Sequence, residues 1–146
     1  MKPIEGDAWR DFVLEAPRPA ICAVLLADGR PHATPVWVDV DGDELLFTTW
    51  HESLKAHALA RDPRVSLCVQ DDRPPFAFVT IRGTARVIDD VEAVRSWSAR
   101  IGGRYMGEDR AEEFGRRNGV PGELLVRVRV EKISGATEMA GSPATP

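Results

Sequence analysis

The chain of 146 residues is poor in the residue types that build metal sites and disulfide frameworks. It has two cysteines and three histidines, and neither a Cys-x-x-Cys nor a His-Glu-x-x-His pattern. Cys22 and Cys68 each lie in an apolar run, where a free cysteine behaves as a small hydrophobic residue. We therefore expect two free thiols, a reducing cytoplasmic location and no bound metal.

Long apolar runs and an excess of positive charge are also missing. No run approaches the roughly 20 apolar residues of a bilayer-spanning helix, and residues 1–10 carry Glu5, Asp7 and Trp9 where a signal peptide would be apolar. The net charge is −4, from 19 basic and 23 acidic residues mixed along the chain. Because nucleic acids require a basic face, we expect neither a nucleic-acid partner nor a membrane span.

Two common catalytic motifs are absent as well. The chain lacks the Gly-x-Ser-x-Gly turn of serine hydrolases and the Gly-x-Gly-x-x-Gly turn of Rossmann dinucleotide sites. Its hydrophobic fraction of 43% and charged fraction of 29% are ordinary for a globular protein, and its length fits one domain.

Short apolar runs separated by turn residues predict a mainly β fold. Asp28-Gly29 and Asp41-Gly42 are typical of tight hairpins, and they indicate that the first three strands form an antiparallel meander. Gly83 indicates a bulge within a long strand. The predicted strands span residues 20–26, 32–40, 44–49, 64–70, 76–87 and 123–133.

Helical spacing of apolar residues predicts four helices between and before these strands. The third begins after Asp90 and is expected to end at Gly102-Gly103, while residues from Ser134 onward look like a flexible tail. The order of elements predicts a single split β-barrel domain over 1–146, with six or more mostly antiparallel strands, flanking helices and an ordered core of about 7–133. The predicted helices span residues 7–14, 53–60, 91–101 and 109–117.

The junction between the third strand and the second helix is the strongest candidate for chemistry. The strand ends in Thr48 and Thr49, and the helix begins with Ser53 at its N-cap and Lys55 in its first turn. A helix N-terminus offers free N–H groups and a positive dipole end, so this arrangement suits a phosphate. The alternative is that Ser53 only caps the helix and Lys55 is solvated.

Four ordered segments resemble the pyridoxamine 5′-phosphate oxidase-like split barrels. These are the hairpin of residues 28–37, the strand end, Ser-x-Lys helix and Leu-x-Arg-Asp-Pro-Arg of 46–64, the long strand of 79–85, and the Arg-Tyr-Met-Gly of 104–107. The resemblance extends over about residues 18–133. It implies an FMN-binding split barrel that works as an oxidoreductase.

Within this superfamily the chain is most similar to the actinobacterial branch that uses the deazaflavin coenzyme F420. Thr34 and Asp39 stand where the true pyridoxamine phosphate oxidases place an Arg and a Lys that hold the FMN phosphate. The resemblance thus implies hydride transfer between F420 and a small organic substrate. The alternatives are an FMN-dependent enzyme of the same fold, and a non-catalytic flavin- or deazaflavin-binding protein.

The resemblance also implies a homodimer with a cofactor site at the subunit interface. The sheet and the Lys55 helix would hold most of the coenzyme, and Arg104 and Tyr105 would reach across from the partner subunit. Trp37 would line the ring pocket or the dimer interface, or pack in the core. The expected cofactor-binding residues are Thr34, Pro35, Val36, Trp37, Thr48, Thr49, Ser53, Leu54, Lys55, Arg61, Arg104 and Tyr105.

Overall fold

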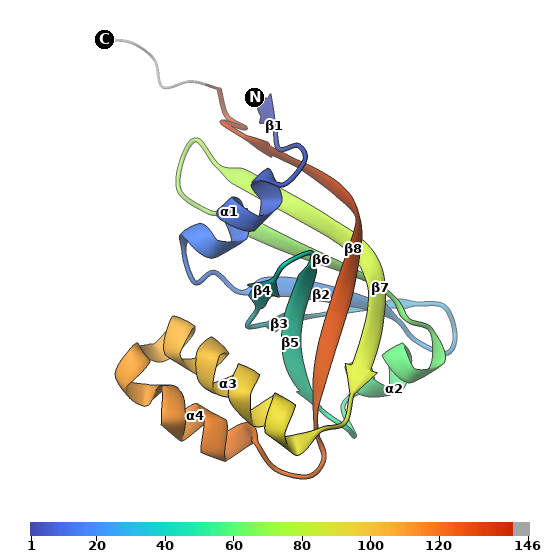
Figure 1. Cartoon of the computed structure of the whole chain (residues 1–146). Coiled ribbons are helices and arrows are strands. Elements are labelled where there is room, and N and C mark those ends of the chain that lie inside the picture. The colour runs from blue at the N-terminus through green and yellow to red at the C-terminus, as the bar shows by residue number, and fades with distance from the viewer. Residues whose placement is uncertain (142–146) are drawn as a thin grey trace.

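Eight antiparallel strands form one curved sheet in the computed structural model, which describes residues 1–141 (Figure 1). The strand order is β3-β2-β6-β7-β8-β5-β4, and β1 pairs with the far end of β8. This mainly β architecture with flanking helices confirms the predicted fold class. In chain order the elements are β1 (Lys2–Pro3), α1 (Ala8–Glu15), β2 (Ala20–Leu25), β3 (Pro31–Val36), β4 (Asp39–Asp41), β5 (Glu44–Trp50), α2 (Leu54–Arg61), β6 (Arg64–Asp71), β7 (Ala77–Ile88), α3 (Val91–Met106), a 3-10 turn (Glu108–Arg110), α4 (Ala111–Asn118) and β8 (Glu123–Thr137).

The predicted three-strand meander is wrong in its middle strand. Both hairpins form, with positive φ angles at Gly29 and Gly42, but the run 32–40 divides into β3 and β4, which lie at opposite ends of the strand order. The division falls at Trp37 and Val38. Side chains of α3 bond the N–H and the C=O of Val38, so its backbone is paired to a helix instead of a neighbouring strand.

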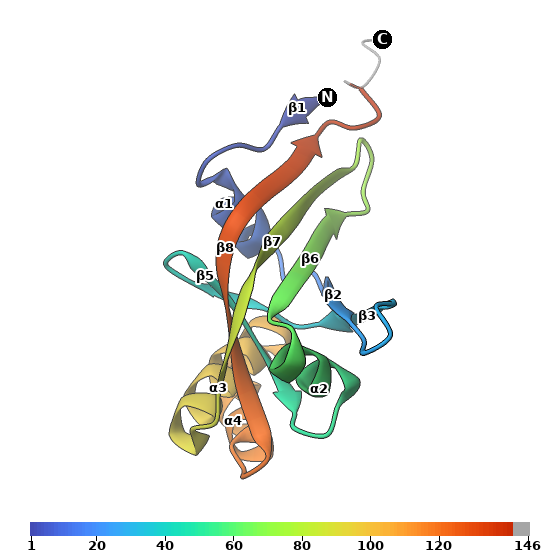
Figure 2. The same cartoon turned by 90° about the vertical axis from the view of Figure 1, so that its right-hand side faces the viewer.

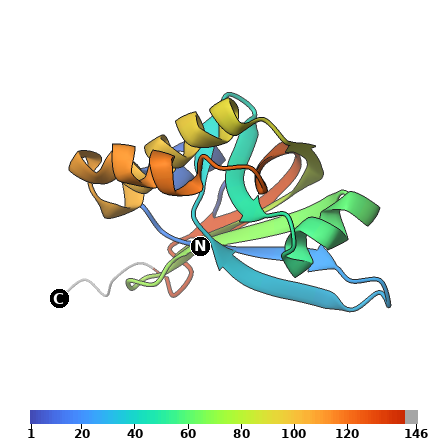
Figure 3. The ribbon, with the colours of Figure 1, turned by 90° about the horizontal axis from the view of Figure 1, so that it is seen from below.

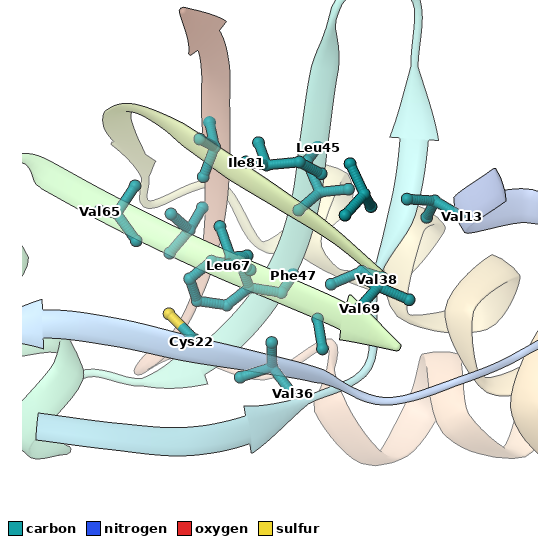
Figure 4. Packing of buried hydrophobic residues seen from close by; sticks show 14 of the residues in the cluster. Val13, Cys22, Val36, Val38, Leu45, Phe47, Val65, Leu67, Val69 and Ile81 are labelled. Carbon is teal, nitrogen blue, oxygen red and sulfur yellow. The ribbon is translucent and has the colours of Figure 1, made fainter. Parts of the chain in front are cut away.

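The core lies on the concave side of the sheet, where alternate residues of several strands meet (Figure 4). Phe47, Leu67 and Ile81 are fully buried there, together with Val38 at the division between β3 and β4. Cys22 belongs to the same cluster, and its burial raises the pKa of the thiol to about 11 against the opposing effect of the Lys55 charge. Both cysteines are free, as expected.

Of the two longest strands, β7 agrees with the prediction and β8 extends beyond its predicted end. The bulge expected at Gly83 is confirmed by a register shift between Arg82 and Gly83. The predicted flexible tail from Ser134 begins inside β8, because residues 134–136 pair with β7 on one side, and residues 136–137 pair with β1 on the other. Strand partners on both sides thus override the loop-like composition. Residues 142–146 of the predicted tail lie outside the described residues.

The end of the third helix also differs from the prediction. Helix α3 continues through Gly102-Gly103 to Met106. A Cβ added at Gly102 would lie 2.3 Å from the Cβ of Phe114, so this glycine permits α4 to pack closely against α3. The glycines therefore serve helix packing, and the helix does not end there.

Helix α2 and the α3–α4 pair lie at the same end of the sheet, away from the two termini (Figure 2). Viewed from below, they flank β5 on its two sides (Figure 3). No helix within residues 1–141 has the length and apolar character needed to cross a membrane.

Candidate functional site

A pocket of about 470 Å³ lies where the ends of β3 and β5 meet the first turn of α2 and the α3–α4 pair. Six of the twelve residues predicted from the sequence line it, and they come from β3, the segment after it, β5 and α2. These are Pro35, Val36, Trp37, Thr48, Thr49 and Lys55. The remaining lining residues are Pro19, Ser98, Ile101, Gly102, Phe114 and Asn118.

Lys55 supplies the charge of this pocket. Its Nζ donates a hydrogen bond to Oγ1 of Thr34, 2.7 Å away on β3. Within residues 1–141, Lys55 forms no ion pair with a carboxylate, and no other charged residue lines the pocket. A half-buried ammonium group without a counter-ion is suited to pair with an anion.

The N-terminus of α2 is fixed by a pair of hydroxyl groups. Ser53 caps the helix, its Oγ accepting from the N–H of Ala56 at 3.1 Å, and the same oxygen lies 2.8 Å from Oγ1 of Thr49. Thr49 is 6% exposed. The expected cap is therefore confirmed, and the cap also ties the end of β5 to the start of α2, which directs Lys55 into the pocket.

Aromatic side chains form one wall. Trp37 stacks on Tyr105 with a centroid separation of 5.0 Å and an interplanar angle of 5°, and it meets Phe114 edge-on at 5.7 Å. Trp37 keeps 37% of its surface exposed. A rigid, partly exposed indole beside a cation suits a planar ligand that carries an anionic group.

Arg104 and Tyr105 bond within their own chain rather than extending away from it. The guanidinium of Arg104 donates to the carbonyls of Val13, Ala16 and Val38. The Tyr105 hydroxyl accepts from the N–H of Val38 at 3.0 Å and donates to the carbonyl of Arg18 at 2.8 Å. Burial raises the pKa of Tyr105. These hydrogen bonds hold α3 against the segment between β3 and β4. Both side chains therefore stabilise the pocket although they do not line it.

Two other predicted residues lie away from this pocket. Leu54 and Arg61 line a separate hollow on the far side of α2, and Arg61 donates to the carbonyl of Leu25 at 3.0 Å. A further hollow of about 610 Å³ lies over β2, β6 and β7, and none of the predicted residues lines it. Within residues 1–141, no three His, Cys, Asp or Glu side chains are grouped as metal ligands.

The predicted site residues did not include any from the α3–α4 wall of the pocket, which contributes Ser98, Ile101, Gly102, Phe114 and Asn118. One signal was available, because Ser98 follows Val94 by four residues and therefore interrupts the apolar stripe of a helix. The residues of α4 gave no comparable signal, since their place depends on how α4 packs on α3.

Comparison with known proteins places the chain in a family. The pyridoxamine 5′-phosphate oxidase family profile matches residues 6–136. The chain belongs to this family. A search of curated proteins found no match.

Solved structures of the same fold agree with the family assignment. A conserved hypothetical protein of Mycobacterium tuberculosis is 27% identical, with a TM-score of 0.83 over 98% of this chain and 92% of its own. A protein named F420 reductase is 22% identical, with a TM-score of 0.70 over 90% and 98%. A FAD-binding protein of Mesorhizobium loti is 17% identical, with a TM-score of 0.66 over 92% and 97%.

Proposed function

We propose that this family member is an oxidoreductase that binds the deazaflavin coenzyme F420 in the pocket between β5, α2 and α3. The observation that carries the proposal is Lys55, which lines a pocket walled by aromatic side chains and has no carboxylate partner among the described residues 1–141. A flavin or deazaflavin coenzyme combines a planar ring with a phosphate, and the pocket offers a matching surface for each part.

The residues present fit such a group. Lys55, with the Thr34 hydroxyl beside it, would hold a phosphate, and Thr48 adds a further hydroxyl to the lining. Trp37 and Phe114 offer apolar faces to the ring. A pocket built only for an apolar ligand would not need an unneutralised lysine, because a half-buried charge without a partner loses hydration.

Two observations favour F420 over FMN. Among the described residues Lys55 is the only cation in the lining, whereas an Arg and a Lys on the second strand would be expected for the FMN phosphate of the true oxidases. At the corresponding positions, Thr34 accepts from Lys55, and Asp39 is 7% exposed and lies outside the pocket. A protein named F420 reductase shares the fold.

When bound, the coenzyme supplies hydride transfer to or from a substrate carbon. The chain's own residues bind and orient it, with Lys55 at the anionic end and the Trp37–Phe114 wall at the ring. The lining contains no His, Asp or Glu among residues 1–141, and the Tyr105 hydroxyl already donates to a carbonyl. The protein's part is therefore binding, orientation and exclusion of water, and we assign no side chain as a proton donor.

A homodimer is part of the proposal. Trp37 and Trp50 keep 37% and 44% of their surfaces exposed at the end of the sheet that carries the pocket, and a second copy packed there would cover them. In this arrangement the small-molecule substrate would enter between the ring and the second subunit.

The test is a fluorescence titration of cofactor-free protein with F420 and, separately, with FMN. The titration compares wild type, Lys55→Gln and the control Lys132→Gln, in which the replaced side chain is exposed on β8. Loss of one charge-assisted contact, about 1.5–3 kcal/mol, should weaken F420 binding about 10- to 100-fold in Lys55→Gln and leave the control unchanged.

Each outcome has a distinct meaning. Tighter binding of FMN than of F420 would replace F420 by FMN as the cofactor. Binding of F420 without reduction of a panel of activated alkenes by its reduced form would make the protein a carrier. Equal affinity of Lys55→Gln and wild type would refute the site, and binding of neither compound would refute the function.

A further inference from the structure

Ser98 is a buried hydroxyl that the protein leaves without a partner. It lies on the sheet-facing side of α3, is 2% exposed, and its Oγ has no hydrogen-bond partner among residues 1–141. Most buried polar atoms in proteins are hydrogen-bonded, so an exception calls for an explanation. Ser98 is also one of the residues that line the 470 Å³ pocket, so a bound molecule would lie next to it.

Ser98 does not make the hydrogen bond that a serine in a helix commonly makes within its own helix. A serine within a helix commonly donates to the carbonyl four residues earlier, here that of Val94, and Ser98 does not. The other lining residues of α3, Ile101 and Gly102, are apolar, and so is Phe114 on α4. A molecule bound in the pocket could supply the missing partner.

We propose that Ser98 is a ligand-binding residue whose hydroxyl hydrogen-bonds a carbonyl oxygen or ring nitrogen at the edge of a planar heteroaromatic ligand. The α3–α4 wall carries no charged side chain, and its second polar group is the amide of half-buried Asn118. Lys55 lies on α2, so the two ends of the pocket differ in chemistry. The α2 end takes the anion and the α3 end takes the polar edge of the ring.

This inference rests on the proposed function, because it assigns the ring of the same coenzyme to the α3 wall. It adds a source of specificity, since an unpaired buried hydroxyl disfavours a ring edge made only of hydrocarbon. Both the flavin and the deazaflavin ring carry carbonyl groups on one edge, so the contact is available to either.

The test uses ring compounds that lack phosphate, which separates the Ser98 contact from the Lys55 contact. Riboflavin and the phosphate-free ring fragment of F420 are titrated, together with FMN and F420, against wild type, Ser98→Ala and Ser96→Ala. Ser96 lies on the exposed face of the same helix, so it is the matched control. The thermal midpoint of each ligand-free protein is recorded in parallel.

We expect Ser98→Ala to lower the affinity for each ring compound that wild type binds by about three- to tenfold, which is the effect of losing one neutral hydrogen bond. The thermal midpoint of ligand-free Ser98→Ala should be unchanged or higher, because the hydroxyl that is removed has no hydrogen-bond partner among residues 1–141. Ser96→Ala should match wild type in both measurements.

Three results would overturn the inference. Unchanged affinity in Ser98→Ala would remove Ser98 from the site and leave the proposed function standing. A lower ligand-free midpoint that accompanies the loss of affinity would show that Ser98 acts through the fold. Failure of wild type to bind any of the four compounds would refute this inference and the proposed function together.

Discussion

Replacing Gly102 by alanine should change stability through two opposing effects, a better helix propensity and a steric clash with α4. Alanine is the better helix former, and the change alone would stabilise the protein by about 1 kcal/mol. The new Cβ, however, would lie 2.3, 2.5 and 2.8 Å from the Cβ, Cγ and Cδ2 atoms of Phe114. The nearest of these atoms is bonded directly to the α4 backbone, so rotation of the phenyl ring cannot relieve the contact.

The contact therefore has to be relieved by moving α4 away from α3. Overpacking of this kind costs about 1–3 kcal/mol, and a contact that only backbone movement relieves belongs near the upper value. After subtraction of the helix-propensity gain, we expect a net destabilisation of about 2 kcal/mol. For a chain of this length, that lowers the thermal midpoint by about 4–8 °C.

Gly103 provides the matched control in the same helix. A Cβ there would meet Oε2 of Glu108 at 2.9 Å, at the end of a flexible side chain, and the Cβ of Ala111 at 3.1 Å. The first contact is relieved by rotation, so Gly103→Ala should stay within about 1 kcal/mol of wild type. Urea unfolding of the three proteins measures the difference.

The same substitution reports on the pocket, because Phe114 lines it and packs edge-on against Trp37. Gly102→Ala should weaken coenzyme binding as well as stability. If Gly102→Ala proves as stable as Gly103→Ala, the close α3–α4 contact is not what keeps glycine at this position, and our account of the helix is wrong.

Two further predictions concern the groups behind the pocket. Tyr105→Phe should destabilise the protein by about 1–2 kcal/mol in urea unfolding at pH 7, because it leaves the Val38 N–H and the Arg18 carbonyl without this partner; an unchanged midpoint would show that water replaces the hydroxyl. Burial raises the pKa of Cys22 from 9.0 to about 11 in the folded protein. The thiol of the unfolded chain therefore ionises at lower pH than the folded one. The free energy of unfolding should keep its full value below pH 9 and fall by about 2–3 kcal/mol as the pH rises to 11. Unfolding midpoints of wild type and Cys22→Ala between pH 8 and 11 test this, and parallel curves would contradict it.

About half of the candidate site could be predicted from local sequence. The cap at Ser53, the position of Lys55 one turn into α2 and the hydroxyls at the end of β5 are encoded within eight consecutive residues, 48–55. Thr34 was predicted from the family resemblance, and its contact with Lys55 joins residues 21 positions apart. Arg104 and Tyr105 were expected to reach across from a partner subunit, and their hydrogen bonds to the backbone of their own chain were not predicted.

The sequence by itself determined the elements and turns that depend on neighbouring residues. Asp-Gly pairs adopt the positive φ angles of hairpins, alternating apolar residues mark a strand with one buried face, and a serine before a helix caps it. These signals predicted most strands of the sheet, the bulge at Gly83 and the start of α2, because each arises from backbone preferences within a few residues.

Tertiary structure alone decided where distant segments meet. It divided the run 32–40 at Val38, whose backbone bonds to α3, and it kept Gly102 helical because α4 needs the space. It also extended β8 to Thr137 by pairing with β7 and β1, and it left Ser98, beside the pocket, without a hydrogen-bond partner among residues 1–141. In each case the deciding contact joins segments well separated along the chain, so the free energy that selects it has no counterpart in the local sequence pattern.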